Sequence, residues 1–145
     1  MSDSDFTPAV NKTVRKGKVI FEISGTHARF KLTSLITCLT NSIRIETEFT
    51  PLKMTEYRGP LALVYSLKMN RSALALGQRG VLAPGTATFA TQAGSVALKF
   101  DPNIWGPTGE SGKQTVSLGG NLMLFEFAGA SEPKNNVLNA ELILP

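Results

Sequence analysis

The feature that most constrains the fold is a period-two alternation of apolar and polar residues that recurs along the chain. It is clearest in SIRIETEF, residues 42–49. The apolar or β-branched positions of this segment are Ile43, Ile45, Thr47 and Phe49, and the charged positions between them are Arg44, Glu46 and Glu48. This alternation predicts a β-strand with one buried and one solvated face.

Similar β patterns follow one another through most of the chain, and we expect about eight strand regions. The first joins KVIFEIS (18–24) to RFKLTSLI (29–36). Residues 60–69, PLALVYSLKM, are apolar on both faces and predict a central strand. Of the later segments, SVALKFD (95–101) places Val96, Leu98 and Phe100 on one face. Gly119 and Gly120 interrupt KQTVSLGGNLMLFEFAGA, where we expect a bend or bulge.

Helical signals are weak beside these strand patterns. TSLITCLTN (33–41) and NRSALALGQRG (70–80) each have the length of a helical turn or two, the second capped by Asn70 and stopped by Gly77 or Gly80. Thirteen glycines and eight prolines separate the strands, without βα alternation. The expected fold is therefore all-β, an antiparallel two-sheet sandwich or a barrel, with short helical turns in its loops.

The connection between the strands at 42–49 and 60–69 is too long and too charged for a two-residue hairpin. Pro51 and Pro60 delimit it. In a jelly roll, connections cross from one sheet of the sandwich to the other, and consecutive strands are then joined by longer segments. We expect such a crossing here.

Charge is concentrated near the start of the chain. The formal net charge is +4 over 145 residues, and NKTVRKGK (11–18) contains four cations and no acid: Lys12, Arg15, Lys16 and Lys18. Such a segment attracts phosphates of any nucleotide sequence through counterion release. The alternative is a solvated leader that keeps the chain soluble. The expected organisation is a basic N-terminal arm (1–18) followed by one β-sandwich domain (19–145).

Catalytic chemistry finds little support in the residues, so we expect no enzyme, no cofactor and no metal. His27 is the only histidine and Cys38 the only cysteine; we expect the first to be a surface or hydrogen-bonded turn residue and the second a small buried hydrophobe. Glu46 and Glu48 predict a solvated face, with calcium between subunits a minor alternative. Trp105 is expected to pack at the end of the sandwich and not to stack on a base.

Two loop segments have weaker interpretations. GPTGESGKQT (106–115) contains glycines and a lysine but lacks the spacing of a phosphate-binding loop, so we expect a plain connection between strands. Met54 and Tyr57, in the charged connection, are candidates for a contact between subunits.

The N-terminus lacks the pattern of a signal peptide and no segment has the length of a membrane span, which favours a soluble, intracellular protein without a membrane partner.

Several of these segments together resemble the small jelly-roll coat (capsid) proteins of positive-strand RNA viruses. The resemblance rests on FTPLKMTEYRGPLALVYSLKMN, then KFDPNIWGPTG, then GGNLMLFEFAGASEPKNNVLNAELIL, and it covers about Val19 to the C-terminus. It implies a jelly-roll subunit that assembles with copies of itself into a small icosahedral shell around single-stranded RNA. It also implies a place in the virion, and in the host cytoplasm during assembly.

The basic segment occupies the place of the inward-facing arm of such proteins, which implies RNA contact at Lys12, Arg15, Lys16 and Lys18. The chain departs from that family in two respects: its arm contains few arginines, and its length leaves no room for a projecting domain. Two other classes remain open. One is a nucleic-acid-binding viral accessory or movement protein with a jelly-roll core, and the other is a ligand-binding β-sandwich of lectin or cytokine type.

Overall fold

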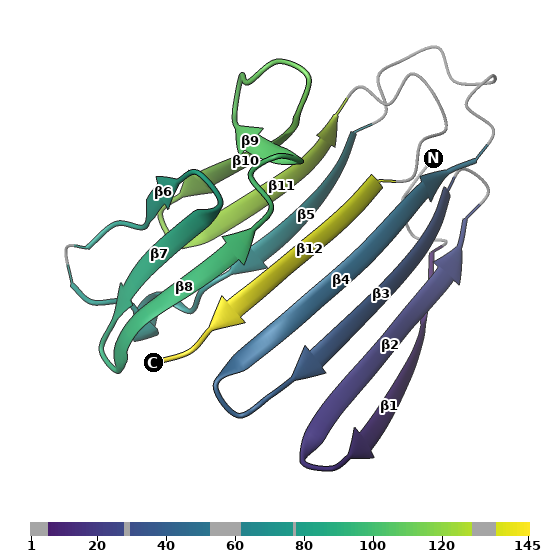
Figure 1. Cartoon of the computed structure of the whole chain (residues 1–145), viewed down its shortest axis with the longest axis horizontal. Helices are drawn as coiled ribbons and strands as arrows, with labels where there is room; N and C mark the ends of the chain where they lie inside the picture. The colour runs from purple at the N-terminus through teal and green to yellow at the C-terminus, as the bar shows by residue number, and fades with distance from the viewer. Residues whose placement is uncertain (1–5, 28–29, 53–61, 77, 129–135) are drawn as a thin grey trace. The chain divides into compact units, whose positions relative to one another are not determined.

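The computed structural model describes residues 6–27, 30–52, 62–76, 78–128 and 136–145. Over these residues the chain forms twelve β-strands and one short 3-10 helix (Figure 1). The elements are β1 (Ala9–Arg15), β2 (Lys18–Thr26), β3 (Phe30–Cys38), β4 (Ser42–Pro51), β5 (Ala62–Lys68), η3 (Arg71–Ala73), β6 (Val81–Ala83), β7 (Thr86–Thr91), β8 (Gly94–Phe100), β9 (Trp105–Pro107), β10 (Gln114–Gly119), β11 (Leu122–Ala128) and β12 (Asn136–Ile143). The all-β prediction is confirmed.

The strands form two sheets, so the predicted two-sheet sandwich is confirmed as well. The larger sheet has the order β1-β2-β3-β4-β12-β8-β7-β6, and the smaller has the order β5-β11-β10-β9. Strands β9 and β10 run parallel, whereas the pairs β1–β2, β2–β3, β3–β4, β5–β11, β6–β7, β7–β8, β8–β12 and β10–β11 are antiparallel. The chain changes sheet between β4 and β5, as expected for the long connection, and again before β6, β9 and β12. These crossings are compatible with a jelly-roll-like fold. Residues 53–61 of the connection lie outside the described residues.

The chain divides into two compact units. The first comprises residues 1–61 and 129–139, and its described strands are β1 to β4 with the first half of β12. The second comprises residues 62–128 and 140–145, and it contains β5 to β11 with the rest of β12.

The first unit is built on an antiparallel meander, because β1, β2, β3 and β4 pair in chain order (Figure 1). The alternation in β4 has the predicted effect: Ile45, Thr47 and Phe49 are buried, and the charged residues between them are exposed. Thr47 is opposite Ser34 of β3, and their buried hydroxyls form a 2.8 Å hydrogen bond. The apolar face of this meander also contains Phe21 and Ile36, which lie opposite each other.

The second unit has an aromatic core. Trp105 is 1% exposed, and its ring meets those of Phe125 and Phe127 edge to face, with centroids 5.0 and 4.9 Å apart. Phe100 of β8 makes a similar contact with Phe125 of β11, at 5.8 Å, so residues of the two sheets share this core. The prediction that Trp105 packs in the sandwich is confirmed. Burial of Val96, Leu98 and Phe100 on one face of β8 is confirmed too.

The expected number of strands was wrong. The first strand region is two strands, β2 and β3, and the His27 amide after β2 donates to the Phe30 carbonyl at the start of β3. Three further strands, β1, β6 and β9, were not expected. The last two have three residues each, too short for an alternation to be recognised. Strand β1 lies inside the predicted basic arm, where lysine and arginine obscure its β-branched residues.

The interpretation of residues 60–69 as a central strand was wrong. Strand β5 lies at the end of its sheet, and β11 is its only partner among the described strands. Val64, which faces away from the core, is 51% exposed. An apolar residue on the outer face was therefore not a sign of burial on both sides.

Of the two expected helical turns, the structure contains one. Residues 33–38 belong to β3, so the helical turn at 33–41 was wrong, because β-branched side chains and pairing on both sides hold this segment extended. Residues Arg71–Ala73 form one 3-10 turn, and the Asn70 side chain accepts from the Ser72 amide, which confirms the predicted cap. No helix in the described part of the chain is long and apolar enough to cross a membrane.

The glycine pair between β10 and β11 forms a turn and not a bulge within a strand. Gly119 pairs with Leu122, so Gly120 and Asn121 are the two turn residues. Gly120 has φ +60, a conformation that side-chain-bearing residues rarely adopt. The Asn121 side chain donates to the Met69 carbonyl and accepts from Arg71, which ties this turn to the segment after β5.

Candidate nucleic-acid interface

Residues 9–15 of the predicted basic arm form β1, which pairs with β2 in a β-hairpin. Arg15 pairs directly with Lys18, so the turn consists of Lys16 and Gly17 alone. Their φ angles are +47 and +75, and two-residue hairpins of this type need positive φ at both positions. Glycine adopts this conformation at no steric cost, whereas lysine has to place its Cβ close to the following carbonyl. Lys16 is the only described residue other than glycine with a positive φ.

The structure brings three of the four predicted cations together. Arg15 and Lys18 lie opposite each other on one face of the hairpin, and Lys16 lies in the turn between them. All three side chains are exposed. We call Arg15, Lys16 and Lys18 the basic tip. Two like charges directly opposite each other destabilise a strand pair slightly, so the tip is a place where an anion would be stabilising.

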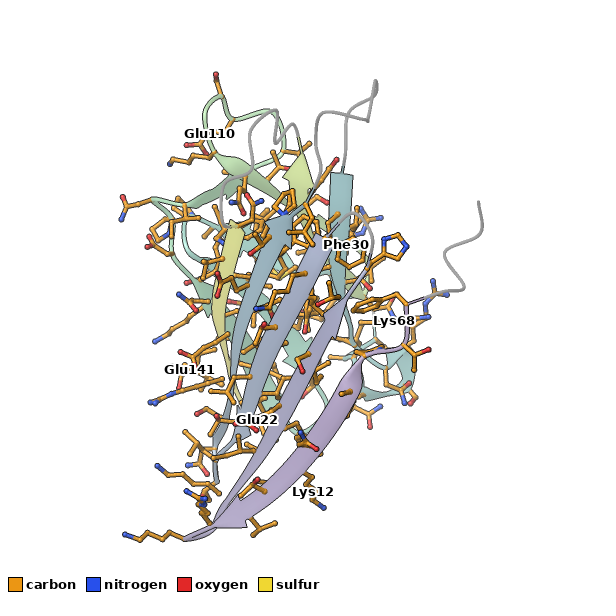
Figure 2. The ribbon with its side chains drawn as sticks, turned by 90° about the vertical axis from the view of Figure 1, so that its right-hand side faces the viewer. Lys12, Glu22, Phe30, Lys68, Glu110 and Glu141 are labelled. Atoms are coloured by element: carbon orange, nitrogen blue, oxygen red, sulfur yellow. The ribbon has the colours of Figure 1, made fainter. Side chains whose placement is uncertain are left out.

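Lys12 lies apart from the basic tip, because it is on the other face of β1. It is opposite Phe21, and its Nζ lies 6.0 Å from the centre of that ring. Lys12 therefore projects from the apolar face of the meander, while Glu22 of β2 belongs to the polar face (Figure 2). Alternation of side chains along a strand makes this division unavoidable for residues 12 and 15.

A fourth cation joins the polar face near the basic tip. Arg44 of β4 is opposite Thr37, which is opposite Ile20, which is opposite Thr13. This row of four residues is next to the row that contains Arg15 and Lys18. Arg44 is exposed, at a sheet spacing of roughly 15 Å from β1. In the sequence Arg44 is recognisable only as a polar position of a strand, because the register between β1 and β4 is not visible there.

Acidic residues lie farther from the tip on the same face. Glu22 and Glu46 share the next row, and Glu48 lies beyond it, all exposed. The outward placement of Glu46 and Glu48 is confirmed. Within the described residues, none of Arg15, Lys16 and Lys18 forms an ion pair. The polar face thus has a basic end at the turn and an acidic middle.

Neither His27 nor Cys38 belongs to the basic tip. The half-buried His27 stacks on Phe30, with centroids 5.1 Å apart. Cys38 is half-buried, so its expected full burial was wrong, because it lies near the end of β3, where the apolar face is less covered. Met54 and Tyr57 are outside the described residues. No group of three or more potential metal ligands occurs in the part of the chain that the structure describes.

Residues 108–113 of the segment 106–115 form the expected connection between β9 and β10, and the ends of the segment belong to these two strands. Lys113 makes a 2.6 Å ion pair with Glu110 and donates to the Pro102 carbonyl at 2.9 Å. The carboxylate of Glu110 also lies close to Gly106, where a Cβ would collide with it. Lys113 thus serves to hold the loop together and is less available to a phosphate than the lysines of the basic tip.

No protein-family model matches this chain, and neither does any curated protein.

Proposed function

We propose that this chain is a self-assembling viral coat subunit of jelly-roll type that packages single-stranded RNA in a small icosahedral shell. The two-sheet sandwich and its connections between sheets support the architectural part of this proposal. The resemblance in strand order and loop pattern supports the viral part. The subunit would associate with copies of itself in the virion, after synthesis in the host cytoplasm.

The observation that carries the proposed RNA contact is the placement of cations at one end of the first unit's polar face. Arg15, Lys16 and Lys18 meet at a two-residue turn, and Arg44 lies on the same face. A lysine in a left-handed turn position costs about 1–2 kcal/mol relative to glycine. A charge kept at a conformational cost supports a role for the charge itself.

The chemistry of this surface suits phosphate and not bases. Lysine and arginine bind phosphate oxygens at any nucleotide sequence, by charge and by hydrogen bonds. No aromatic ring belongs to the basic tip, and Trp105 is buried in the second unit. We therefore expect binding to be sensitive to salt and insensitive to nucleotide sequence. Lys12, on the opposite face of the hairpin, would contribute to the same field with less direct contact.

A charge-matched pair of variants tests the RNA contact. The first carries Arg15→Ala, Lys16→Ala and Lys18→Ala. The control removes three exposed lysines elsewhere, with Lys31→Ala, Lys68→Ala and Lys99→Ala. Both variants lose three positive charges, so the comparison separates the site from the net charge.

The measurement is the dissociation constant for single-stranded RNA over a series of salt concentrations. Loss of three phosphate contacts reduces the slope of log K against log salt by about 2, since each contact contributes about 0.7 for single strands. We expect this reduction in the first variant and a much smaller one in the control. Equal slopes in the two variants would reject the basic tip as the contact. Circular dichroism on both variants checks that the sheets still form.

Assembly is tested separately, with the full chain purified in the presence of RNA. Negative-stain microscopy and sedimentation are expected to show closed particles whose ultraviolet absorbance includes nucleic acid. A second candidate, a viral accessory or movement protein, is favoured by the same basic tip, which needs no shell in order to bind RNA. Such a protein would coat single strands without forming closed particles, and that result would decide for the second candidate.

A further inference from the structure

Among the described residues, strand β1 ends the larger sheet and has one edge without a pairing partner. Its only partner among the described strands is β2 (Figure 1). An open edge presents unpaired backbone N–H and C=O groups, which can pair with a strand of another chain. The open edge here is seven residues long, Ala9–Arg15, and contains no proline. This length is sufficient for pairing with the same strand of a second copy, unless a residue of the edge disfavours that pairing.

The turn determines which residues of β1 present their backbone to this edge. In a hairpin with a two-residue turn, the residues flanking the turn form a hydrogen-bonded pair, and such pairs alternate along the ladder. Arg15, Thr13, Asn11 and Ala9 therefore bond to β2. The backbone groups of Val10, Lys12 and Val14 point to the open edge.

The same three residues also project their side chains from the apolar face of the meander. Val10 is 58% exposed and Val14 is 65% exposed, the two apolar residues of β1 that an added strand would cover. Lys12 lies midway between them, with its Nζ 6.0 Å from the centre of the Phe21 ring. A charged residue on the apolar side of an edge strand is one way in which sheet proteins block pairing between copies.

A second copy of this chain is the occupant that the edge fits best, because the edge is self-complementary. A two-fold axis through Lys12 pairs Val10 with Val14 of the second copy, and Val14 with Val10. All three pairs are then hydrogen-bonded pairs, so the backbone groups of both edges are satisfied. The one unfavourable feature of this register is that Lys12 lies opposite its own copy, with Cβ atoms about 5 Å apart.

We propose that the β1 edge is a self-association surface and that Lys12 disfavours its pairing with a second copy, because the two lysines repel each other. The inference concerns Lys12 and the open edge alone and requires no RNA contact. It goes beyond the proposed function, since the contacts of a shell do not have to include this edge. The prediction is that neutralising residue 12 strengthens association through this edge, and that an opposite charge on one of the two copies strengthens it further.

The first test compares Lys12→Thr with the control Lys31→Thr, in nucleic-acid-free protein. Lys31 is an exposed lysine on β3, which has partners on both sides. Two unit charges about 5 Å apart in water repel by an amount worth about a fourfold change in an equilibrium constant. We therefore expect Lys12→Thr to associate about fourfold more tightly in sedimentation equilibrium, with no change for Lys31→Thr.

Amide hydrogen exchange shows whether the association uses this edge. Pairing at β1 protects the amides of Val10, Lys12 and Val14, which are open in the isolated chain, whereas contacts elsewhere do not. Exchange is measured for the Lys12→Thr protein at low and high concentration. Tighter association without protection of residues 10 and 14 would overturn the proposal.

A charge-swap experiment tests the register. The Lys12→Glu protein alone is expected to remain as dissociated as the unchanged protein, since glutamates then face each other. An equal mixture of the Lys12→Glu protein and the unchanged protein places lysine opposite glutamate. This mixture is expected to associate roughly tenfold more tightly than either protein alone. Salt distinguishes the cases further: at about 1 M it screens the charges, strengthening association of the unchanged protein and weakening that of the mixture. A mixture that associates no more than its components would refute the two-fold pairing.

Discussion

The substitution Lys16→Asn separates the conformational cost of the basic tip from its proposed binding role. Lys16 has φ +47 in a turn of two residues. Asparagine adopts positive φ more readily than lysine, and Asn-Gly is a preferred sequence for such turns. The change therefore relieves backbone strain and removes one charge from the tip at the same time.

The size of the stability effect follows from the turn geometry. A residue with a Cβ in the left-handed region costs about 1–2 kcal/mol, and asparagine recovers a part of this, which we take as about 0.5–1 kcal/mol. In a domain of this length, 1 kcal/mol corresponds to a shift in melting temperature of about 2–4 °C. The expected rise is thus about 1–4 °C. Removing one cation from the tip, where Arg15 and Lys18 face each other, adds to the stabilisation slightly.

The binding effect has the opposite sign. Loss of one phosphate contact reduces the slope of log K against log salt by about 0.7 for single-stranded RNA. Thermal unfolding by circular dichroism and fluorescence anisotropy with labelled RNA measure the two effects on the same preparation. The expected result is a more stable protein that binds RNA more weakly.

The control is Lys31→Asn, in the regular strand β3, where asparagine is unfavourable and no turn is relieved. It is expected to lower the melting temperature slightly and to leave the salt slope nearly unchanged. Destabilisation by Lys16→Asn would contradict the turn conformation. Stabilisation by Lys16→Asn with an unchanged salt slope would contradict the phosphate contact but would still support the turn conformation.

Three further substitutions test the fold. Trp105→Ala removes the centre of the aromatic core and is expected to lower the free energy of unfolding by about 3–5 kcal/mol in urea titrations, whereas Ile104→Ala at the surface costs less than about 1 kcal/mol. Thr47→Val leaves the Ser34 hydroxyl buried without its partner and should cost about 1–3 kcal/mol, while adding Ser34→Ala should restore most of the loss; no restoration would argue against the hydrogen bond. Gly120→Ala, at φ +60, should lower the melting temperature by an amount equivalent to about 1 kcal/mol, and a neutral result would contradict the two-residue turn between β10 and β11.

Strands with one buried face could be predicted from the sequence. In β4 the residues Ile45, Thr47 and Phe49 are buried and their neighbours exposed, as the alternation indicates. Burial on one side imposes the period, and the period is visible in the sequence. Strand β8 follows the same rule.

Strands without a covered face could not be predicted in this way. In β1 the apolar positions, Val10 and Val14, remain exposed, and Lys12 interrupts them. The charges of this segment suggested an arm, although β-branched residues are frequent in it. For β5 the reverse happened: apolar residues on both faces suggested a central position, but Val64 is exposed at a sheet edge. Pairing partners decide such cases, and a single sequence does not contain them.

The candidate site was predictable in composition and not in geometry. Its cations could be identified from their spacing along the chain. Their division between two faces depends on strand formation, and the addition of Arg44 depends on the register through β2 and β3. The left-handed conformation of Lys16 requires knowledge that the turn has two residues. The Lys-Gly pair was the only local signal for it.

The most direct test of the central claim is a cryo-electron microscopy reconstruction of the full chain assembled with RNA. The proposed function predicts closed shells of identical β-sandwich subunits, with the turn at Lys16 and Gly17 facing interior density from RNA. Protein that forms no particles, or particles in which this turn faces away from the nucleic acid, would contradict it.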